Sequence, residues 1–358
     1  MRIRSVRARA IDLPLQRPVE LSSGTMRSAP LVLVDVQTEE GPVGVSYVRC
    51  YTPVAMHPLA ALVENLEELL RGDASDPAAV AAKLDRHFLL VGPQGLTGIA
   101  MAAIDMALWD AQAKALDMPL VRLLGGQMVP VPAYASLRTM GARGAAAEAE
   151  SRVNEGFTAL KLKVGPNLDR TLESIRAVRG AVGDGVSLMV DYNQSLTVCE
   201  ALEHVRALDG EGLAWIEEPT RADDFAGHAR IAAAAATPIQ LGENWWGVHD
   251  LEKSIAAGAS DNLMFDAMKI GGVTGWLAAA KIAQAAGLSV SSHTFPEFSV
   301  HLLGVTRSAM WLEYLDHTSP ILLEPVRVER GLAYAPARAG SGLAWDEPAI
   351  NGYLSRDP

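Results

Sequence analysis

Two lysines in one short apolar segment are the first sign of chemistry in this sequence. Lys161 and Lys163 alternate with apolar residues in FTALKLKVG, residues 157–165. This alternation predicts a strand, in which side chains two residues apart share one face, about 6–7 Å from each other. Two ammonium groups at that distance are costly unless negative charge faces them. A lysine held neutral in such a place could also act as a base.

Acidic residues end three later apolar segments at regular spacing. They are Asp191 in VSLMVD, Glu217 in LAWIEE and Glu243 in IQLGE. Three carboxylates at the ends of neighbouring strands would offer only oxygen ligands, which suits Mg²⁺ or Mn²⁺ better than Zn²⁺. Burying them together without a cation would be prohibitive. One such acid alone could be a helix N-cap or a solvated loop residue, but three in register favour a metal site. Glu218, which follows Glu217 directly, is expected to support a metal ligand or to pair with a cation.

The next three apolar segments also end in polar residues, Asp266, His293 and Glu313. His293 is the second acid/base candidate, because Asp266 ends the preceding strand and could hold the tautomer of the imidazole. Glu313 would have to be protonated in order to donate a hydrogen bond to a substrate; the alternative is a rim carboxylate that pairs with a cation. Three other histidines lack such neighbours and are expected to be structural: His249, His301 and His317.

These residues need a scaffold that brings strand ends together. After residue 126 the sequence repeats a short apolar strand segment, a loop and an Ala-rich helical segment. Eight strand segments end at intervals of 20–28 residues, at Ser136, Lys163, Asp191, Glu217, Glu243, Asp266, His293 and Glu313. This spacing predicts an α/β fold with a (β/α)8 TIM-type barrel. The carboxyl ends of its strands converge on one mouth, where active sites form. The last interval is the shortest, so the eighth unit is the least regular.

The residues before 126 have a different organisation. Two strand patterns with a hairpin turn at residues 40–42 precede two helical patterns, near 57–72 and 97–116. Strands followed by helices predict an α+β domain. We therefore expect three parts: an α+β capping domain and substrate lid over residues 1–126, the catalytic barrel over 127–320, and a C-terminal segment, 321–358, that returns to the cap.

Composition narrows the class of protein. The chain has 358 residues, a net charge of −11 and no basic patch, so a nucleic-acid partner is not expected. Cys50 and Cys199 are too few for a disulfide framework or a zinc site. The N-terminus shows no signal-peptide pattern, and no apolar run is long enough to span a bilayer. These features predict a cytoplasmic protein with no membrane partner.

Together the motifs resemble a known family. KLK, MVDYNQSL, WIEEPT, LGEN, DAMKIGGVTGW, SSH and WLE occur in this order and spacing, and the chain resembles the enolase superfamily, in particular its mandelate racemase subgroup. The resemblance implies abstraction of the proton α to a carboxylate, which gives an enediolate. It also implies one Mg²⁺ per chain, for which Mn²⁺ could substitute, a small carboxylate substrate and a homo-oligomer.

The resemblance also implies roles for the site residues. Asp191, Glu217 and Glu243 would bind the metal, and Lys161 would pair with the substrate carboxylate while its charge disfavours protonation of Lys163. Lys163 and His293 would then act on opposite faces of a planar intermediate, which leads to racemisation of a 2-hydroxy acid. Position 266 supports this subgroup, because the muconate-cycloisomerase and dipeptide-epimerase branches carry a lysine there. The same bases serve acid-sugar dehydratases, which is the alternative; a non-enzymatic binding or structural role is the third.

Substrate contacts are expected from the barrel and the cap. Asn193 is expected at the α-hydroxyl and Ser136 at the carboxylate, although either could cap the following helix. In the cap the matching residues are Tyr51, which is retained, and the loop residues Ser22, Ser23 and Arg27. The matching loop of the resembled subgroup is largely apolar, and Arg49, Arg138 and Thr139 are further polar differences. A polar 2-hydroxy acid is therefore expected rather than an aryl one.

Overall fold

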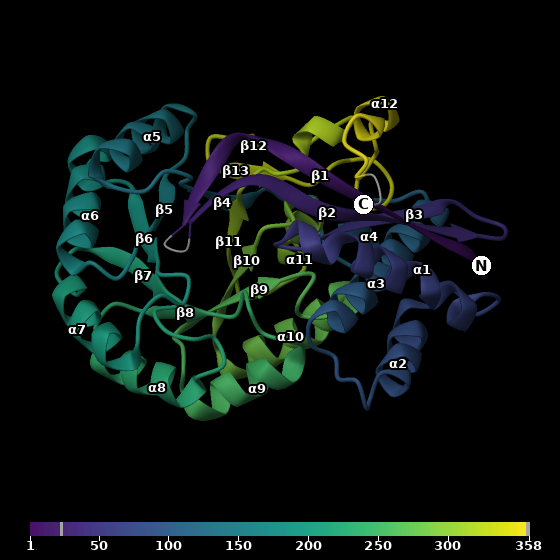
Figure 1. Cartoon of the computed structure of the whole chain (residues 1–358), viewed down its shortest axis with the longest axis horizontal. Coiled ribbons are helices and arrows are strands. Elements are labelled where there is room, and N and C mark those ends of the chain that lie inside the picture. The colour runs from purple at the N-terminus through teal and green to yellow at the C-terminus, as the bar shows by residue number, and fades with distance from the viewer. Residues whose placement is uncertain (22–23, 356–358) are drawn as a thin grey trace.

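The structure is a computed structural model that describes residues 1–21 and 24–355. Eight parallel strands close into a barrel, because each pairs with the next in chain order and the last pairs with the first. Figure 1 shows this barrel with its helices outside. The strands are β4 (Val131–Ser136), β5 (Ala159–Lys163), β6 (Ser187–Asp191), β7 (Leu213–Glu217), β8 (Ile239–Leu241), β9 (Asn262–Asp266), β10 (Ser289–His293) and β11 (Ala309–Tyr314). The predicted barrel is confirmed.

Seven α-helices connect these eight strands. They are α5 (Ala142–Asn154), α6 (Leu168–Val182), α7 (Val198–Leu208), α8 (Phe225–Ala234), α9 (Val248–Ala257), α10 (Gly272–Ala286) and α11 (Pro296–Leu303). β11 is followed by a 3₁₀ turn (Ser319–Ile321) and then by the strands β12 (Arg327–Glu329) and β13 (Leu332–Tyr334). This differs from a regular eighth unit, and Pro325, between the 3₁₀ turn and β12, disfavours a longer helix there.

The interior of the barrel is packed below the site. Tyr134, Ala159, Met189, Trp215 and Met264 form a buried cluster of their own, separate from the main core. The ring of Tyr134 meets that of Trp215 edge to face at 5.5 Å. This layer of large side chains closes the floor under the strand ends, so the polar groups above it open only toward the mouth.

The N-terminal part is an antiparallel sheet with helices on it. The sheet consists of β1 (Ile3–Leu21), β2 (Gly24–Thr38) and β3 (Val43–Arg49), and the helices are α1 (Met56–Leu70), α2 (Pro77–His87), α3 (Leu96–Ala115) and α4 (Leu120–Leu123). α2 was not predicted, although Asp76 caps it and Pro77 occupies its first turn. α3 is buried on most sides and joins this part to the barrel: Asp105 accepts from the amide of Thr274 in α10.

The C-terminal segment lies against the N-terminal part. Arg9 pairs with Glu347 of α12 (Glu347–Asn351) at 2.6 Å, and the indole of Trp345 donates to Asp35. Ser341 donates through its amide and its hydroxyl to the buried Asp110 of α3. Both ends of the chain therefore lie on the cap side of the molecule (Figure 1).

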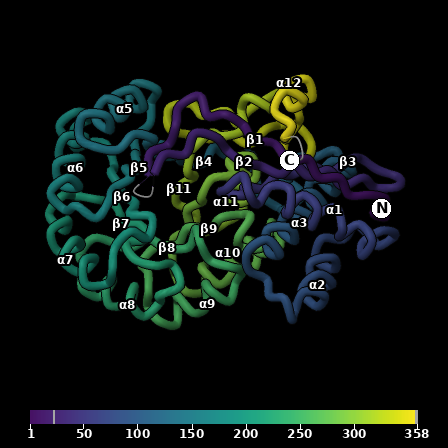
Figure 2. Tube along the Cα trace, viewed as in Figure 1, coloured from purple at the N-terminus to yellow at the C-terminus, as the bar shows by residue number. Residues whose placement is uncertain are grey.

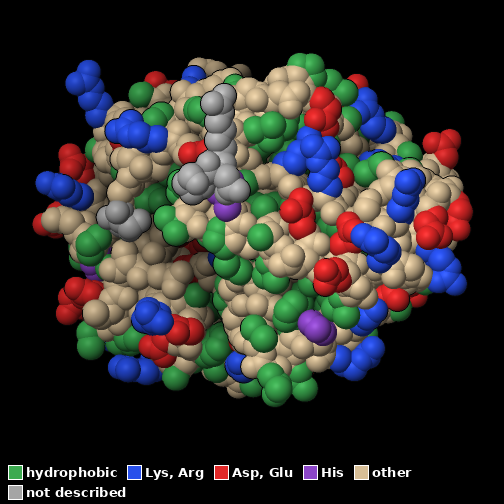
Figure 3. Space-filling model, turned by 45° about the vertical axis from the view of Figure 1, so that its right-hand side comes forward, with side chains coloured by type: hydrophobic (Ala, Val, Ile, Leu, Met, Phe, Trp, Pro, Cys, Tyr) green, Lys and Arg blue, Asp and Glu red, His purple; other side chains and the backbone are tan. Residues whose placement is uncertain are grey.

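The remaining features are the position of the β1–β2 hairpin, the charges on the surface and the hydropathy of the helices. The β1–β2 hairpin runs from the cap across the barrel toward β5, as the tube in Figure 2 shows. Acidic and basic side chains are interspersed on the face drawn in Figure 3. Within residues 1–21 and 24–355, no helix is long and apolar enough to cross a membrane.

Candidate active site

Three carboxylates from consecutive strands meet at the mouth of the barrel. Asp191 ends β6, Glu217 ends β7, and Glu243 lies two residues beyond the end of β8. Each offers an oxygen within 4.8 Å of the others, and all three side chains are buried. The predicted metal ligands are thus brought together, although β8 is shorter than expected and the last ligand comes from a turn.

Gly242 makes that turn possible. Its φ of +132° is reserved for glycine, and a Cβ there would lie 2.4 Å from the carbonyl oxygen of Met264 and 3.0 Å from the Trp245 ring. The backbone of β8 therefore approaches β9 closely just before Glu243.

Gly242→Ala should displace Glu243 from the carboxylate cluster. We expect a loss of stability of about 1–3 kcal/mol, because alanine is strained at the φ that glycine adopts here. We also expect a smaller rise in melting temperature on addition of Mg²⁺. Calorimetry with and without Mg²⁺ measures both effects. Gly185→Ala is the control, since a Cβ there meets no atom within 4 Å. An unchanged Mg²⁺ response in Gly242→Ala would contradict this role for the turn.

Lys161 lies at the centre of the acidic cluster. Its Nζ is 2.5 Å from Glu217 Oε1, 2.9 Å from Glu313 Oε1 and 3.6 Å from Asp191 Oδ2. Burial alone would lower the pKa of Lys161, but Glu217 and Glu313 raise it well above its ordinary value. This lysine is therefore a fixed positive charge that faces the carboxylates, as its place beside Lys163 predicted.

Glu313, expected to be protonated toward a substrate, is paired with a lysine in this structure. Burial favours the neutral carboxyl, but Lys161 and then His293 outweigh burial and lower the pKa of Glu313 to about 2. Its Oε2 also accepts from the amide of Thr294 at 3.1 Å. The sequence shows that this glutamate ends a strand, but not that a lysine two strands away in the closed barrel reaches it. Glu313 is thus paired with a cation, as in the alternative, but it is buried rather than at the rim, and its hydrogen bond to a substrate stays a prediction.

Lys163 is the lysine at the open end of β5. Its Nζ donates to Asp191 Oδ2 at 3.1 Å and to Asn193 Oδ1 at 3.0 Å. Asn193 donates in turn to Asp191 through its amide side chain and its backbone. The alternative role of Asn193 as a helix cap is excluded, because Thr197 caps α7. Asn193 therefore ties the lysine to a metal-ligand candidate.

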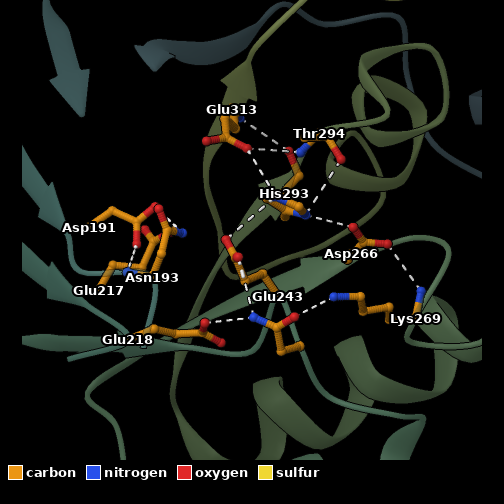
Figure 4. Close-up of polar contacts among 12 residues, drawn as sticks. Asp191, Asn193, Glu217, Glu218, Glu243, Asp266, Lys269, His293, Thr294 and Glu313 are labelled. Carbon is orange, nitrogen blue, oxygen red and sulfur yellow. Dashed lines mark hydrogen bonds and ion pairs between the residues drawn. The ribbon is translucent and has the colours of Figure 1, made fainter. Parts of the chain in front are cut away.

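His293 and Asp266 form the predicted pair on the other side of the mouth. Nδ1 of His293 lies 2.6 Å from Asp266 Oδ2, and Nε2 lies 3.5 Å from Glu243 Oε2 and 3.8 Å from Glu313 Oε2 (Figure 4). The other oxygen of Asp266 accepts from the amides of Met268 and Lys269. Asp266 is thereby fixed, and it orients the ring so that Nε2 faces the carboxylates.

A second polar network lies below Glu243. Asn244 donates to Glu218 Oε2 at 2.6 Å and to Glu243 Oε1 at 3.3 Å, and it accepts from Lys269. Glu218 is fully buried, in agreement with its expected supporting position. Asn244 was missed, and only its place directly after Glu243 could have indicated it. The hydrogen bond from Asn244 thus holds the side chain of Glu243 in place.

The cap residues predicted to contact substrate have unequal support. Ser22 and Ser23 lie outside the described residues, and Arg27 is exposed on β2. Tyr51 is 45% exposed, with the Lys269 ammonium 4.7 Å and the Arg49 guanidinium 5.0 Å from its ring centre. Tyr51 thus joins the cap to the network under Glu243, while Arg27 stays a prediction.

The loop after β4 fastens the hairpin to the barrel. Glu20 of β1 donates its amide to the Arg138 carbonyl at 2.7 Å, and its side chain accepts from the amide of Met140 at 2.6 Å. The Arg138 guanidinium donates to the carbonyls of Arg17 and Asp316. Arg138 therefore bridges the cap and the loop after β11, which its sequence position did not indicate.

A cavity of about 690 Å³ lies between β1 and the loops that follow β4 and β11. Ser136, Arg138 and His317 are among the residues that line it. The hydroxyl of Ser136 is buried without a hydrogen-bond partner in the described part of the chain, and Gly141 rather than Ser136 caps α5. The hydroxyl of Ser136 could therefore bond a group placed in this cavity, and its role at the substrate carboxylate stays a prediction.

The carboxylate cluster fits a divalent metal ion. Burial raises the pKa of Glu217 well above its usual value, which Lys161 only partly offsets, and Asp191 and Glu243 add to the rise. A divalent cation among the three carboxylates would remove this repulsion. An all-oxygen donor set of this kind suits Mg²⁺.

A barrel with three clustered carboxylates, a lysine and a His–Asp pair at its mouth defines a class: metal-dependent enzymes that abstract a proton next to a carboxylate. Two family models match, "Mandelate racemase / muconate lactonizing enzyme, N-terminal domain" over residues 3–125 and "Enolase C-terminal domain-like" over 144–349. The chain belongs to the mandelate racemase / muconate lactonizing enzyme family of the enolase superfamily.

Individual relatives differ in their reactions. An enolase from Bradyrhizobium, solved with magnesium and mandelic acid, is 42% identical, with a TM-score of 0.96 over 99% of both chains. L-talarate/galactarate dehydratase of Salmonella typhimurium is 32% identical over 97% of this chain and 90% of its own length. N-succinyl-L-Arg/Lys racemase of Bacillus cereus is 28% identical over 84% of this chain and 82% of its own. The family includes both racemases and dehydratases.

Proposed function

We propose that this protein removes the α-proton of a 2-hydroxy carboxylate and racemises that carbon. The observation that carries the proposal is the placement of two bases. Lys163 ends β5 and His293 ends β10, three strands apart by the shorter way around the closed barrel, with the acidic cluster between them. Bases on two sides of a planar intermediate allow a proton to leave one face and return to the other.

The chain's own residues hold the substrate and move the proton. Lys161 and the buried hydroxyl of Ser136 are placed to bind the substrate carboxylate. Lys163 Nζ takes the α-proton of one enantiomer and His293 Nε2 that of the other, while Asp266 stabilises the imidazolium. Asp191, Glu217 and Glu243 would hold Mg²⁺, whose positive charge would stabilise the negative charge that develops on the substrate carboxylate when the α-proton leaves. Glu313 keeps Lys161 charged and in place.

Dehydration of an acid sugar is the second candidate. Lys163 would take the α-proton, the bond from C3 to its hydroxyl would break, and His293 would give the leaving oxygen a proton; the resulting enol becomes a keto acid. The polar residues around the cavity favour this candidate, and one relative is named a talarate/galactarate dehydratase. A purely structural role is disfavoured, because both bases and all three ligands are present together.

Exchange of the α-proton in D₂O, followed by NMR, tests the proposal. With Mg²⁺ present we expect one or more of mandelate, 2-hydroxyhexanoate, gluconate and galactarate to exchange the proton at C2. A racemase should convert one configuration into the other while the amount of hydroxy acid stays constant. Release of a keto acid, trapped as its semicarbazone, would identify the dehydratase instead. Absence of exchange across a full panel of 2-hydroxy acids and acid sugars would contradict both.

A further inference from the structure

His317 is held rigidly at the mouth of the barrel, although its sequence position suggested only a structural role. Both flanking residues are fixed. Asp316 accepts from the amides of Thr318 and Ser319, and its own carbonyl accepts from Arg138. On the other flank, the Thr318 hydroxyl donates to Glu297 at 2.8 Å.

Glu297 anchors this turn to the cap. It is buried in α11 and also accepts from the phenol of Tyr47 in β3 at 2.6 Å. The turn that carries His317 is therefore fastened to the cap, to α11 and to the loop after β4. Supporting bonds of this kind are how proteins preorganise a binding group.

The imidazole itself lacks a hydrogen bond that it should have. Only 6% of His317 is exposed, and its Nε2 is buried without a partner among the described residues. Leaving a buried polar atom unpaired is costly, so such an atom calls for a ligand or a water. The side chain lines the same cavity as Ser136, whose hydroxyl is unpaired too.

Burial and nearby positive charge favour the neutral form of the His317 imidazole. Burial lowers the pKa of His317 well below its ordinary value, and Arg49, Arg138, His293 and Lys163 lower it further. A neutral ring can either donate or accept at Nε2, which suits a hydroxyl group. His317 follows the end of β11 by three residues, and Ser136, which lines the same cavity, lies in register with Lys161 across β4 and β5.

We propose that His317 is a specificity-determining residue that hydrogen-bonds a substrate hydroxyl beyond the reacting carbons, so that the substrate is a polyhydroxy acid. This inference rests on the proposed function, because it assigns the substrate class of the same site. An aryl or alkyl chain would leave Nε2 of His317 without a hydrogen-bond partner in that cavity. A site built to bond a hydroxyl discriminates strongly against an analogue that lacks it.

Matched substrate pairs test this assignment. Gluconate is compared with 2-hydroxyhexanoate, which are both monocarboxylates, and galactarate with 2-hydroxyadipate, which are both dicarboxylates. Within each pair the two acids differ only in the hydroxyls beyond C2. Wild type should prefer the polyhydroxy member of the pair that it accepts. His317→Leu should lower kcat/KM for that member by about tenfold to hundredfold, and change kcat/KM for its partner by less than about threefold. His317→Gln, whose amide nitrogen replaces Nε2, should recover most of the loss.

Two outcomes of the kinetic comparison overturn the assignment. Wild type without preference within either pair would show that no hydroxyl is read there. An equal loss for both members in His317→Leu would show a structural role, and melting temperatures of both variants check that they fold. If wild type exchanges no α-proton with any probe, the proposed function fails first. Calorimetric binding of the same pairs to wild type and His317→Gln with Mg²⁺ then still decides whether His317 reads a hydroxyl.

Discussion

His293→Asn should abolish racemisation and yet leave exchange of the α-proton of one enantiomer with D₂O. The variant keeps a polar side chain beside Asp266 but has no base, while Lys163 and its partners Asp191 and Asn193 are untouched. Loss of a general base costs about 10²–10⁴-fold, so exchange on the His293 side should fall to background. NMR of each enantiomer separately in D₂O measures both rates.

Lys163→Met should give the mirror result and exchange only the other enantiomer. His249→Asn is the matched control for the histidine change, because that ring is exposed on α9 and pairs with Glu252 there. It should retain both rates. Comparable exchange of both enantiomers by His293→Asn would mean that a single base serves both faces, and the two-base mechanism would be wrong.

Removal of divalent metal should abolish α-proton exchange altogether, and added Mg²⁺ should restore it. The ion would stabilise the charge that forms on the substrate carboxylate, and the positive charge of Lys161 is already paired with Glu217 and Glu313. A bound ion also stabilises the folded chain, by about 2.7 kcal/mol at 100 times its Kd. Melting temperature therefore gives a second readout that does not depend on turnover.

Glu217→Gln should lose most of the Mg²⁺-dependent rise in melting temperature, because one of three anionic ligands is gone. Glu252→Gln makes the same chemical change on the exposed surface of α9 and should behave as wild type. Full exchange activity after exhaustive chelation would refute the metal assignment. An undiminished Mg²⁺ response in Glu217→Gln would place the ion elsewhere.

The positions of the reacting groups could be predicted because they follow from the strand period. Parallel strands in a closed barrel end at the same mouth, so an acid at the end of each apolar run had to meet its neighbours there. Asp191 and Glu217 end their strands as expected. Glu243 was placed correctly although β8 stops at Leu241, because the turn at Gly242 returns the chain to the same rim.

Contacts between distant segments could not be predicted in this way. The ionised state of Glu313 depends on Lys161 reaching across from β5, and the bridging role of Arg138 depends on carbonyl groups of β1 and of the loop after β11. His317 carries no local motif, and only the closed barrel brings the loop after β11 to the cavity that Ser136 of β4 also lines. Such features depend on contacts between distant segments, which the hydrophobic periods of strands and helices do not predict.

The return of the C-terminal segment to the cap has a consequence for how this enzyme could diversify. Arg9 and Glu347, or Asp110 and Ser341, join residues from opposite ends of the gene, and α3 is packed against α10 of the barrel. Recombination that exchanged the first 126 codons with those of a relative would separate Arg9, Asp105 and Asp110 from their present partners at once. New substrate preferences are therefore accessible through point substitutions in the hairpin and the mouth loops, and inheritance of the cap is linked to that of the tail.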